Sequence, residues 1–251
     1  MKILSRSFLL SFLMAIPLQL AHAQSPNHQL WYELMLNYSF AGSFNLENAF
    51  VYSTLLESPR WYAFDYTPTL DYSIDNHFDL IAGNTFSYTS QVSSYNTFEI
   101  RPFLGVRFNV TPNQRILTKI LLRLEQRNFL NLDTHDWETV VRPRARAEAV
   151  IPINKKSYFE DKLWYGLIDA EWLFTVDDVE ERFANRFRAR IGIGYRLSYT
   201  TRFEFIYMAQ HSKSGIDQDF ESSDNIFRFR FKQYIRNKKK LSSTSTSGGV
   251  N

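Results

Sequence analysis

The chain has 251 residues, a formal net charge of +3 and no cysteine. This length suits one all-β barrel domain, the near-balanced charge excludes a general basic field for nucleic acid, and the lack of cysteine excludes disulfides, a lipoprotein anchor and thiol chemistry. Aromatic residues make up 16% of the chain, which favours a membrane barrel because such barrels carry aromatic girdles at both interfaces.

The first 23 residues have the composition of a cleavable signal peptide. Lys2 and Arg6 form a basic segment, residues 7–20 are apolar, and Ala21-His22-Ala23 matches the small-residue pattern of a cleavage site. The apolar segment is too short for a membrane anchor and is followed by polar residues. We therefore expect export and cleavage after Ala23.

The rest of the chain alternates apolar and polar residues in eleven runs. In the clearest example, Phe203, Phe205 and Tyr207 alternate with Arg202 and Glu204. Because successive side chains on a strand point to opposite faces, each run predicts a strand with one apolar and one polar face. In chain order the runs cover residues 30–40, 44–54, 62–74, 78–88, 98–108, 116–127, 137–151, 164–174, 186–198, 202–210 and 226–235.

This alternation behind a signal peptide predicts an all-β fold, a transmembrane antiparallel up-and-down β-barrel of 10–12 strands with its apolar faces toward lipid. The barrel domain would cover residues 24–237, and the basic, Ser/Thr/Gly-rich residues 238–251 are expected to be disordered. The mature chain has no apolar run of roughly 18 residues, so no transmembrane helix is expected. A secreted soluble β-protein is the rival class, but it would carry polar residues where the runs carry Phe, Tyr and Leu.

The number of strands is not settled by the number of runs. Eleven is odd, whereas single-chain bacterial barrels have an even number of strands. Either run 30–40 is not a full strand, which gives ten, or one strand is missing, which gives twelve; the alternation of short and longer connections favours ten. Pro68 lies in the apolar series of its run and predicts a distortion, because proline cannot donate to a hydrogen-bond ladder.

The charged face of the runs is the main candidate for function. Its charges are expected to form arginine–carboxylate ladders inside the barrel, since buried ions must be paired. The alternative is a constricted pore or a site for small anionic solutes, with surplus arginines supplying the field. The residues assigned to this lumen ladder are Arg123, Glu125, Arg127, Glu138, Arg142, Arg144, Arg146, Glu148, Asp169, Glu171, Arg186, Arg188, Arg190, Glu204, Arg228 and Arg230.

An enzymatic alternative rests on one short segment. Lipid-modifying barrels (acyl hydrolases or transferases acting on lipid or lipopolysaccharide) use a Ser/His pair, and His211 with Ser212 or Ser214 is the candidate here. A strand brings residues i and i+2 to the same side, but these serines stand at i+1 and i+3, so nucleophile and base do not meet on a regular strand. We therefore predict no catalytic residue. No cofactor or metal site is expected, because no Cys or His/carboxylate spacing suits one.

The tryptophans mostly fall near the ends of runs. Amphipathic rings anchor proteins at the membrane–water interface. We therefore expect Trp31, Trp61, Trp137, Trp164 and Trp172 to be interfacial anchors rather than a ligand-binding platform.

Four segments resemble an uncharacterised family of small outer-membrane β-barrels that is known only as a domain of unknown function. They are Asp136-Trp137-Glu138, Arg142-Pro143-Arg144-Ala145-Arg146-Ala147-Glu148, Phe183-Ala184-Asn185-Arg186-Phe187-Arg188 and Asp224-Asn225-Ile226-Phe227-Arg228-Phe229-Arg230. The resemblance extends from about Trp31 to Tyr234. It implies a membrane barrel and carries over no functional residue.

The signal peptide and the barrel pattern together predict a location in the bacterial outer membrane. The expected partners are outer-membrane lipids, lipopolysaccharide and the barrel-assembly machinery. Small anionic solutes would join them under the pore hypothesis. Nucleic acid is not an expected partner.

Overall fold

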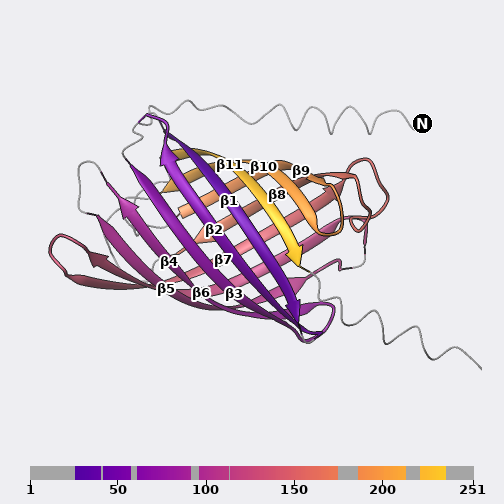
Figure 1. Ribbon diagram of the computed structural model, residues 1–251, viewed down its shortest axis with the longest axis horizontal. Helices are drawn as coiled ribbons and strands as arrows, with labels where there is room; N and C mark the ends of the chain where they lie inside the picture. The colour runs from indigo at the N-terminus through magenta and orange to yellow at the C-terminus, as the bar shows by residue number, and fades with distance from the viewer. Residues whose placement is uncertain are drawn as a thin grey trace, which may run out of the picture.

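The computed structural model describes residues 26–40, 42–57, 61–91, 96–112, 114–174, 186–212 and 221–235, which form an eleven-stranded closed barrel (Figure 1). The strands are β1 (Asn27–Phe40), β2 (Phe44–Leu55), β3 (Tyr62–Ser73), β4 (Phe78–Ser90), β5 (Thr97–Asn109), β6 (Leu117–Asn131), β7 (Trp137–Pro152), β8 (Leu163–Leu173), β9 (Arg186–Arg196), β10 (Thr201–Ser212) and β11 (Glu221–Ile235). The described part of the chain contains no helix with the length and apolarity needed to cross a membrane.

Each of the eleven predicted runs forms a strand, so the all-β barrel is confirmed and the strand number lies within the expected range. The narrower expectation of an even number is wrong. An odd number makes the first and last strands run in the same direction, so β1 and β11 close the barrel as a parallel pair, with Asn27 opposite Asp224 and Tyr38 opposite Ile235. Figure 1 shows the arrows of β1 and β11 side by side and pointing the same way. All other neighbouring strands pair antiparallel.

The connections alternate between the two ends of the barrel. Those that follow β1, β3, β5, β7 and β9 lie at what we call the short-turn end, and those that follow β2, β4, β6, β8 and β10 lie at the long-loop end. β1 begins at the long-loop end. Because the number of strands is odd, β11 ends at the opposite, short-turn end.

The strands are strongly tilted relative to the barrel axis. A row of paired residues that leaves β6 at Leu117 passes through Val150 and Leu167, crosses the β11–β1 seam, and returns to β6 at Asn131. The row therefore climbs from one end of β6 to the other during a single circuit. Such a stagger and tilt are required to close a sheet into a barrel.

The barrel has its charges inside and its apolar side chains outside. Along β8, Trp164 is 45% exposed and Ile168 is 46% exposed, whereas Tyr165 and Glu171 are completely buried. The same alternation places fully buried Arg196 on the inner face of β9. Ionised side chains are almost never fully buried unless they are paired, so these inner charges require partners. The inner face also carries an apolar cluster that includes Leu163, Leu167 and Ile206.

Two prolines interrupt the pairing of neighbouring strands at mid-height. The β3–β4 register passes from Tyr66 to Thr69 without pairing the two residues between them, the second of which is Pro68. The β5–β6 register omits Arg101 and Pro102 in the same way. The predicted distortion at Pro68 is therefore confirmed, because a proline has no N–H for the ladder.

Paired cysteines would test the parallel seam. Tyr32 and Phe229 are register partners with ring centroids 5.8 Å apart. The chain has no other thiol, and adjacent paired strands bring two cysteines within disulfide reach. We expect Tyr32→Cys with Phe229→Cys to form an intramolecular disulfide on oxidation, seen as a mobility shift on non-reducing gels.

The control for this experiment is Tyr32→Cys with Phe205→Cys, because Phe205 lies on β10, one strand beyond β11. This pair should stay reduced. Equal oxidation of both pairs, or oxidation of the control alone, would contradict the parallel closure.

Candidate functional site

The candidate site is the charged inner surface of the barrel, which is organised around a few shared carboxylates. Glu125 of β6 is fully buried and accepts hydrogen bonds from Arg142 (Nη2–Oε2, 2.6 Å) and Arg144 (Nη1–Oε1, 3.2 Å) of β7. Arg123, on the same strand as Glu125, pairs with the same carboxylate. One carboxylate thus contacts three guanidinium groups, and the local charge is positive.

The ladder continues through β8 to β9. Glu171 pairs with Arg144 on one side and accepts a hydrogen bond from Arg190 on the other (Nη2–Oε2, 2.5 Å). Arg190 also pairs with Asp169 (Nε–Oδ1, 2.9 Å), which in turn accepts a hydrogen bond from Arg146 (Nη2–Oδ2, 3.1 Å). Four adjacent strands are therefore joined by one continuous network of charge-assisted hydrogen bonds, which are the strong kind. Two further members of this network are Arg188 and Glu148.

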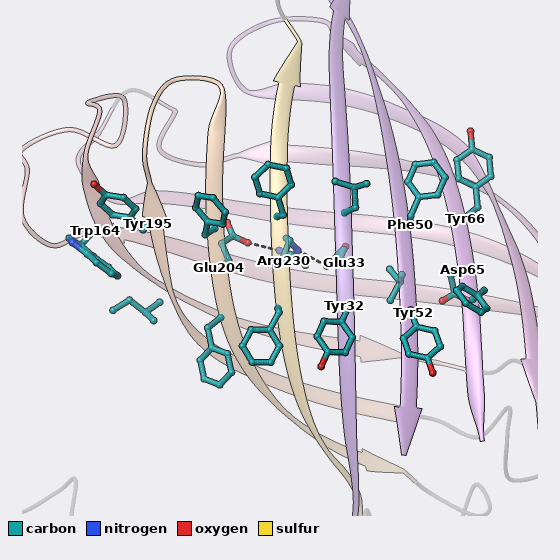
Figure 2. A pocket seen from close by; sticks show the side chains of 18 residues that line it. Tyr32, Glu33, Phe50, Tyr52, Asp65, Tyr66, Trp164, Tyr195, Glu204 and Arg230 are labelled. Carbon is teal, nitrogen blue, oxygen red and sulfur yellow. Dashed lines mark hydrogen bonds and ion pairs between the residues drawn. The ribbon is translucent and has the colours of Figure 1, made fainter. Parts of the chain in front are cut away.

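A second cluster spans the parallel seam. Arg230 of β11 lies between Glu33 of β1 (Nε–Oε2, 2.5 Å) and Glu204 of β10 (Nη1–Oε2, 2.9 Å), as Figure 2 shows. Lys232 approaches Glu204 at 3.2 Å. Tyr165 of β8 donates its hydroxyl to Glu204 across β9 (2.6 Å). The strands that close the barrel are thus held together on the inside by ions and on the outside by the rings drawn in Figure 2.

A third cluster lies on β5 and β6. Glu99 accepts hydrogen bonds from Arg101 on its own strand (Nε–Oε1, 2.6 Å) and from Arg127 on β6 (Nε–Oε1, 2.6 Å). The guanidinium carbon of Arg127 lies 4.3 Å from the centre of the Phe129 ring. The pairing of buried charges that the sequence predicts is therefore confirmed in all three clusters.

An amide–carboxylate chain crosses the seam near the long-loop end. Asp224 accepts hydrogen bonds from Gln29 (2.7 Å) and Gln210 (2.6 Å), and Gln29 accepts one from the indole of Trp31 (2.7 Å). The guanidinium of Arg228 lies 4.5 Å from the Trp31 ring centre. Trp31 shares the inner face of β1 with Glu33, so its expected role as an interfacial anchor is wrong. The tryptophans on the outer face are Trp137, Trp164 and Trp172.

The β7–β8 connection inserts an aromatic residue into the short-turn end of the barrel. Tyr158 is 9% exposed; its backbone oxygen accepts a hydrogen bond from Arg196 (2.7 Å) and its hydroxyl accepts one from Arg202 (2.6 Å). Its ring packs edge-on against Tyr165, 5.3 Å away. The phenol end of Tyr165 in turn lies against Gly194, where any Cβ would collide with the ring. Burial raises the pKa of the Tyr158 phenol. This plug therefore fills the interior beside β7–β10.

One family matches most of the chain. It is described as "Protein of unknown function (DUF2490)", and it matches residues 28–221, from β1 to the first residue of β11. The chain belongs to the DUF2490 family. The match stops before Asp224–Arg230, a segment that we expected to lie within it. No curated protein matches the chain.

The structure of this DUF2490 protein does not join the residues of the enzymatic alternative. The ring of His211 lies against Phe187, with centroids 6.5 Å apart, and the Ser212 hydroxyl contacts the hydroxyl of Ser223 at 3.2 Å. The β10–β11 register shifts just after Gln210. Within the described residues, no hydrogen bond links His211 to Ser212, and Ser214 lies outside those residues. No three His, Cys, Asp or Glu side chains of the described chain could together hold a metal ion.

The structure places every residue of the predicted ladder on the inner face of its strand. Glu138 and Arg186 share that face with the paired residues of β7 and β9. Several inner residues were not assigned to the ladder, although residues such as Arg202 and Lys232 lie on the polar parity of their runs and alternation could have identified them. Tyr158 was missed because alternation identifies strands and says nothing of connections. The inner residues that were missed include Glu33, Asp71, Asp79, Glu99, Arg101, Arg107, Arg196, Arg202 and Lys232.

Removing a shared carboxylate should destabilise the barrel more than removing a peripheral one. We expect Glu125→Gln to lower the free energy of unfolding by about 3–5 kcal/mol, because it leaves buried guanidinium groups without their counter-ion. Denaturant titration of the folded barrel measures this change.

Glu148→Gln is the matched control, since the Glu148 side chain is 26% exposed, that of Glu125 is fully buried, and Glu148 has one arginine partner. Its loss should cost clearly less. A smaller effect of Glu125→Gln than of Glu148→Gln would show that the shared carboxylate does not stabilise the ladder.

Proposed function

We propose that this DUF2490 protein is an integral outer-membrane β-barrel without catalytic activity, whose largely filled, arginine-rich interior serves an envelope role or passes small solutes through a narrow pore. The observation that supports this proposal is the inverted distribution of side chains. Leu104 is 68% exposed and Ile191 is 59% exposed, whereas Glu125 and Glu171 are completely buried. An apolar surface that encircles a protein is unfavourable in water and suits hydrocarbon.

The connections suggest an orientation in the membrane. Outer-membrane barrels have short turns in the periplasm and longer loops outside the cell. The short-turn end, with the Tyr158 plug, would then face the periplasm, and lipopolysaccharide would surround the long-loop end. The signal peptide expected over residues 1–23 supports export, after which the barrel-assembly machinery would insert the strands.

The interior favours anions over cations as solutes. Glu125 and Glu171 each contact three arginines, so positive charge exceeds negative charge around both carboxylates. An arginine-lined constriction attracts small anions and repels cations. The Tyr158 plug obstructs the short-turn end, so transport would be slow.

Introducing a charged residue on the outer face distinguishes a membrane barrel from a soluble one. Ile191 at the middle of β9 and Ile153 in the β7–β8 connection are 59% and 56% exposed. In water, arginine at either position should be harmless. In a bilayer, Ile191→Arg should cost about 2–4 kcal/mol because it places a charge at mid-depth, whereas Ile153→Arg should have no effect.

The readout is the folded fraction in purified outer membranes, measured by heat-modifiable mobility on SDS gels. Wild-type protein should float with the outer-membrane fraction and resist carbonate extraction. Recovery of the wild type in the soluble periplasmic fraction, with both arginine variants folded, would refute the membrane proposal.

Conductance in a planar bilayer tests the pore. With KCl gradients, we expect rare, small, anion-selective steps from the wild type and larger steps from Tyr158→Ala, because that variant removes the plug. Phe159→Ala is the control, since Phe159 is the next residue and is 56% exposed. Arg188→Ala should reduce anion selectivity. Large cation-selective steps from the wild type would contradict the proposal.

A further inference from the structure

A row of polar and proline residues crosses the otherwise apolar outer face. In the strand register Asn48 of β2 is opposite Pro68 of β3, and Asn84 of β4 is opposite Pro102 of β5. Pro68 and Asn84 are neighbours across the interrupted β3–β4 ladder. Asn84 is the middle residue of its strand. The row therefore reaches the mid-height of the barrel wall at Asn84, which has a proline on each side.

Asn84 is the amide of this row without a hydrogen-bond partner. Its Oδ1 is buried and accepts no hydrogen bond from the described residues. By contrast, Asn48 accepts a hydrogen bond from the Tyr66 hydroxyl (2.9 Å). The flanking prolines Pro68 and Pro102 have no N–H to donate. A buried amide oxygen without a donor is costly. Neighbouring atoms of the wall cover Oδ1, so it reaches a donor outside the barrel only when the amide rotates about its Cβ–Cγ bond.

The apolar surface beside this row is hollowed. A groove of about 820 Å³ runs over the outer face of β3–β7 and includes Leu70, Ala82 and Leu104 among its lining residues. These three are register partners, and each lies two residues along its strand from a member of the row, on the same outer face. Leu104 is 68% exposed, more than any other large apolar side chain of the described residues. A projecting leucine thus stands next to the hollow over the small Ala82.

We propose that a second copy of this chain packs against the outer face of β3–β6, with the two-fold axis passing close to Asn84. A two-fold interface brings the same patch of both copies together, so it must be self-complementary. A carboxamide is both donor and acceptor, and rotation about its Cβ–Cγ bond presents either end. Asn84 can therefore bond to Asn84 of the second copy, while each Leu104 enters the hollow over the other copy's Ala82.

This inference rests on the proposed membrane location, because only a bilayer keeps water from the outer face that carries Asn84. The opposite side of the barrel lacks the combination of features. Outer rings at the seam stack on one another, as Tyr32 (labelled in Figure 2) does on Phe229, with ring centroids 5.8 Å apart. In the described residues of β9, β10, β11 and β1, no proline lies in the middle of a strand, and the one register shift falls near the end of β10, after Gln210.

A single cysteine tests the interface, because the chain has none of its own. The variants are Asn84→Cys and, as a control, Ile191→Cys, each at the middle of its strand and on well-separated parts of the wall. We expect Asn84→Cys to give a disulfide-linked dimer on oxidation in native outer membranes. Ile191→Cys should remain monomeric under the same conditions.

Two further variants test the amide contact and the leucine contact separately. Asn84→Leu removes the amide and should weaken dimerisation in detergent about fivefold, the scale of one amide hydrogen bond between membrane segments. Leu104→Ala removes the leucine contact and should weaken dimerisation more than Asn84→Leu does. Heat-modifiable mobility verifies folding of each variant.

The two proposals fail in different ways. A membrane-inserted, folded Asn84→Cys protein that stays monomeric, or that cross-links no faster than Ile191→Cys, would overturn the dimer alone. A protein absent from the membrane fraction would overturn the membrane location.

Discussion

The barrel depends on carboxylates that are each shared by several arginines. Glu125 and Glu171 stand on β6 and β8, and Arg144 of the strand between them pairs with both. Glu125 joins β6 to β7 through Arg142 and Arg144. Glu171 joins three strands, because its partners Arg144 and Arg190 lie on β7 and β9. The arginine–carboxylate pairs between strand residues all lie on the inner face. The outer face of the described strands therefore needs no charged residue and can be apolar. The wall is thus stabilised from within, as an apolar exterior requires.

Much of this arrangement follows from the alternation of the sequence. On a strand, the backbone itself sends successive side chains to opposite faces, so Arg144 and Glu171 could be placed inside without knowing their partners. Trp31 obeys the same rule, although we expected it on the outer face. Its position near a run end suggested an anchor, but its parity with Glu33 placed it inside, and parity decided the outcome.

What the sequence could not predict are the contacts between distant segments. The alternation within a strand does not state how the first and last strands meet, so the parallel pairing of β1 with β11 was unexpected. Nor does it show that Tyr158, in a connection, would accept hydrogen bonds from Arg196 and Arg202 on β9 and β10. These contacts join a connection to two strands that follow it in the chain, and alternation within a strand carries no information about them.

The many arginines of the inner face would suit a selectivity filter, but they are also needed to fill a barrel of this diameter. About eight strands enclose an interior that ordinary side chains can fill, and eleven strands enclose a wider one. Long guanidinium side chains extend into this space from the wall and carry their own hydrogen-bond donors, and Tyr158 occupies the interior beside β8–β10. Filling of the interior and the anion selectivity that we propose would therefore use the same residues. They differ in one respect, because a filter needs an opening at both ends, and the plug closes part of one end.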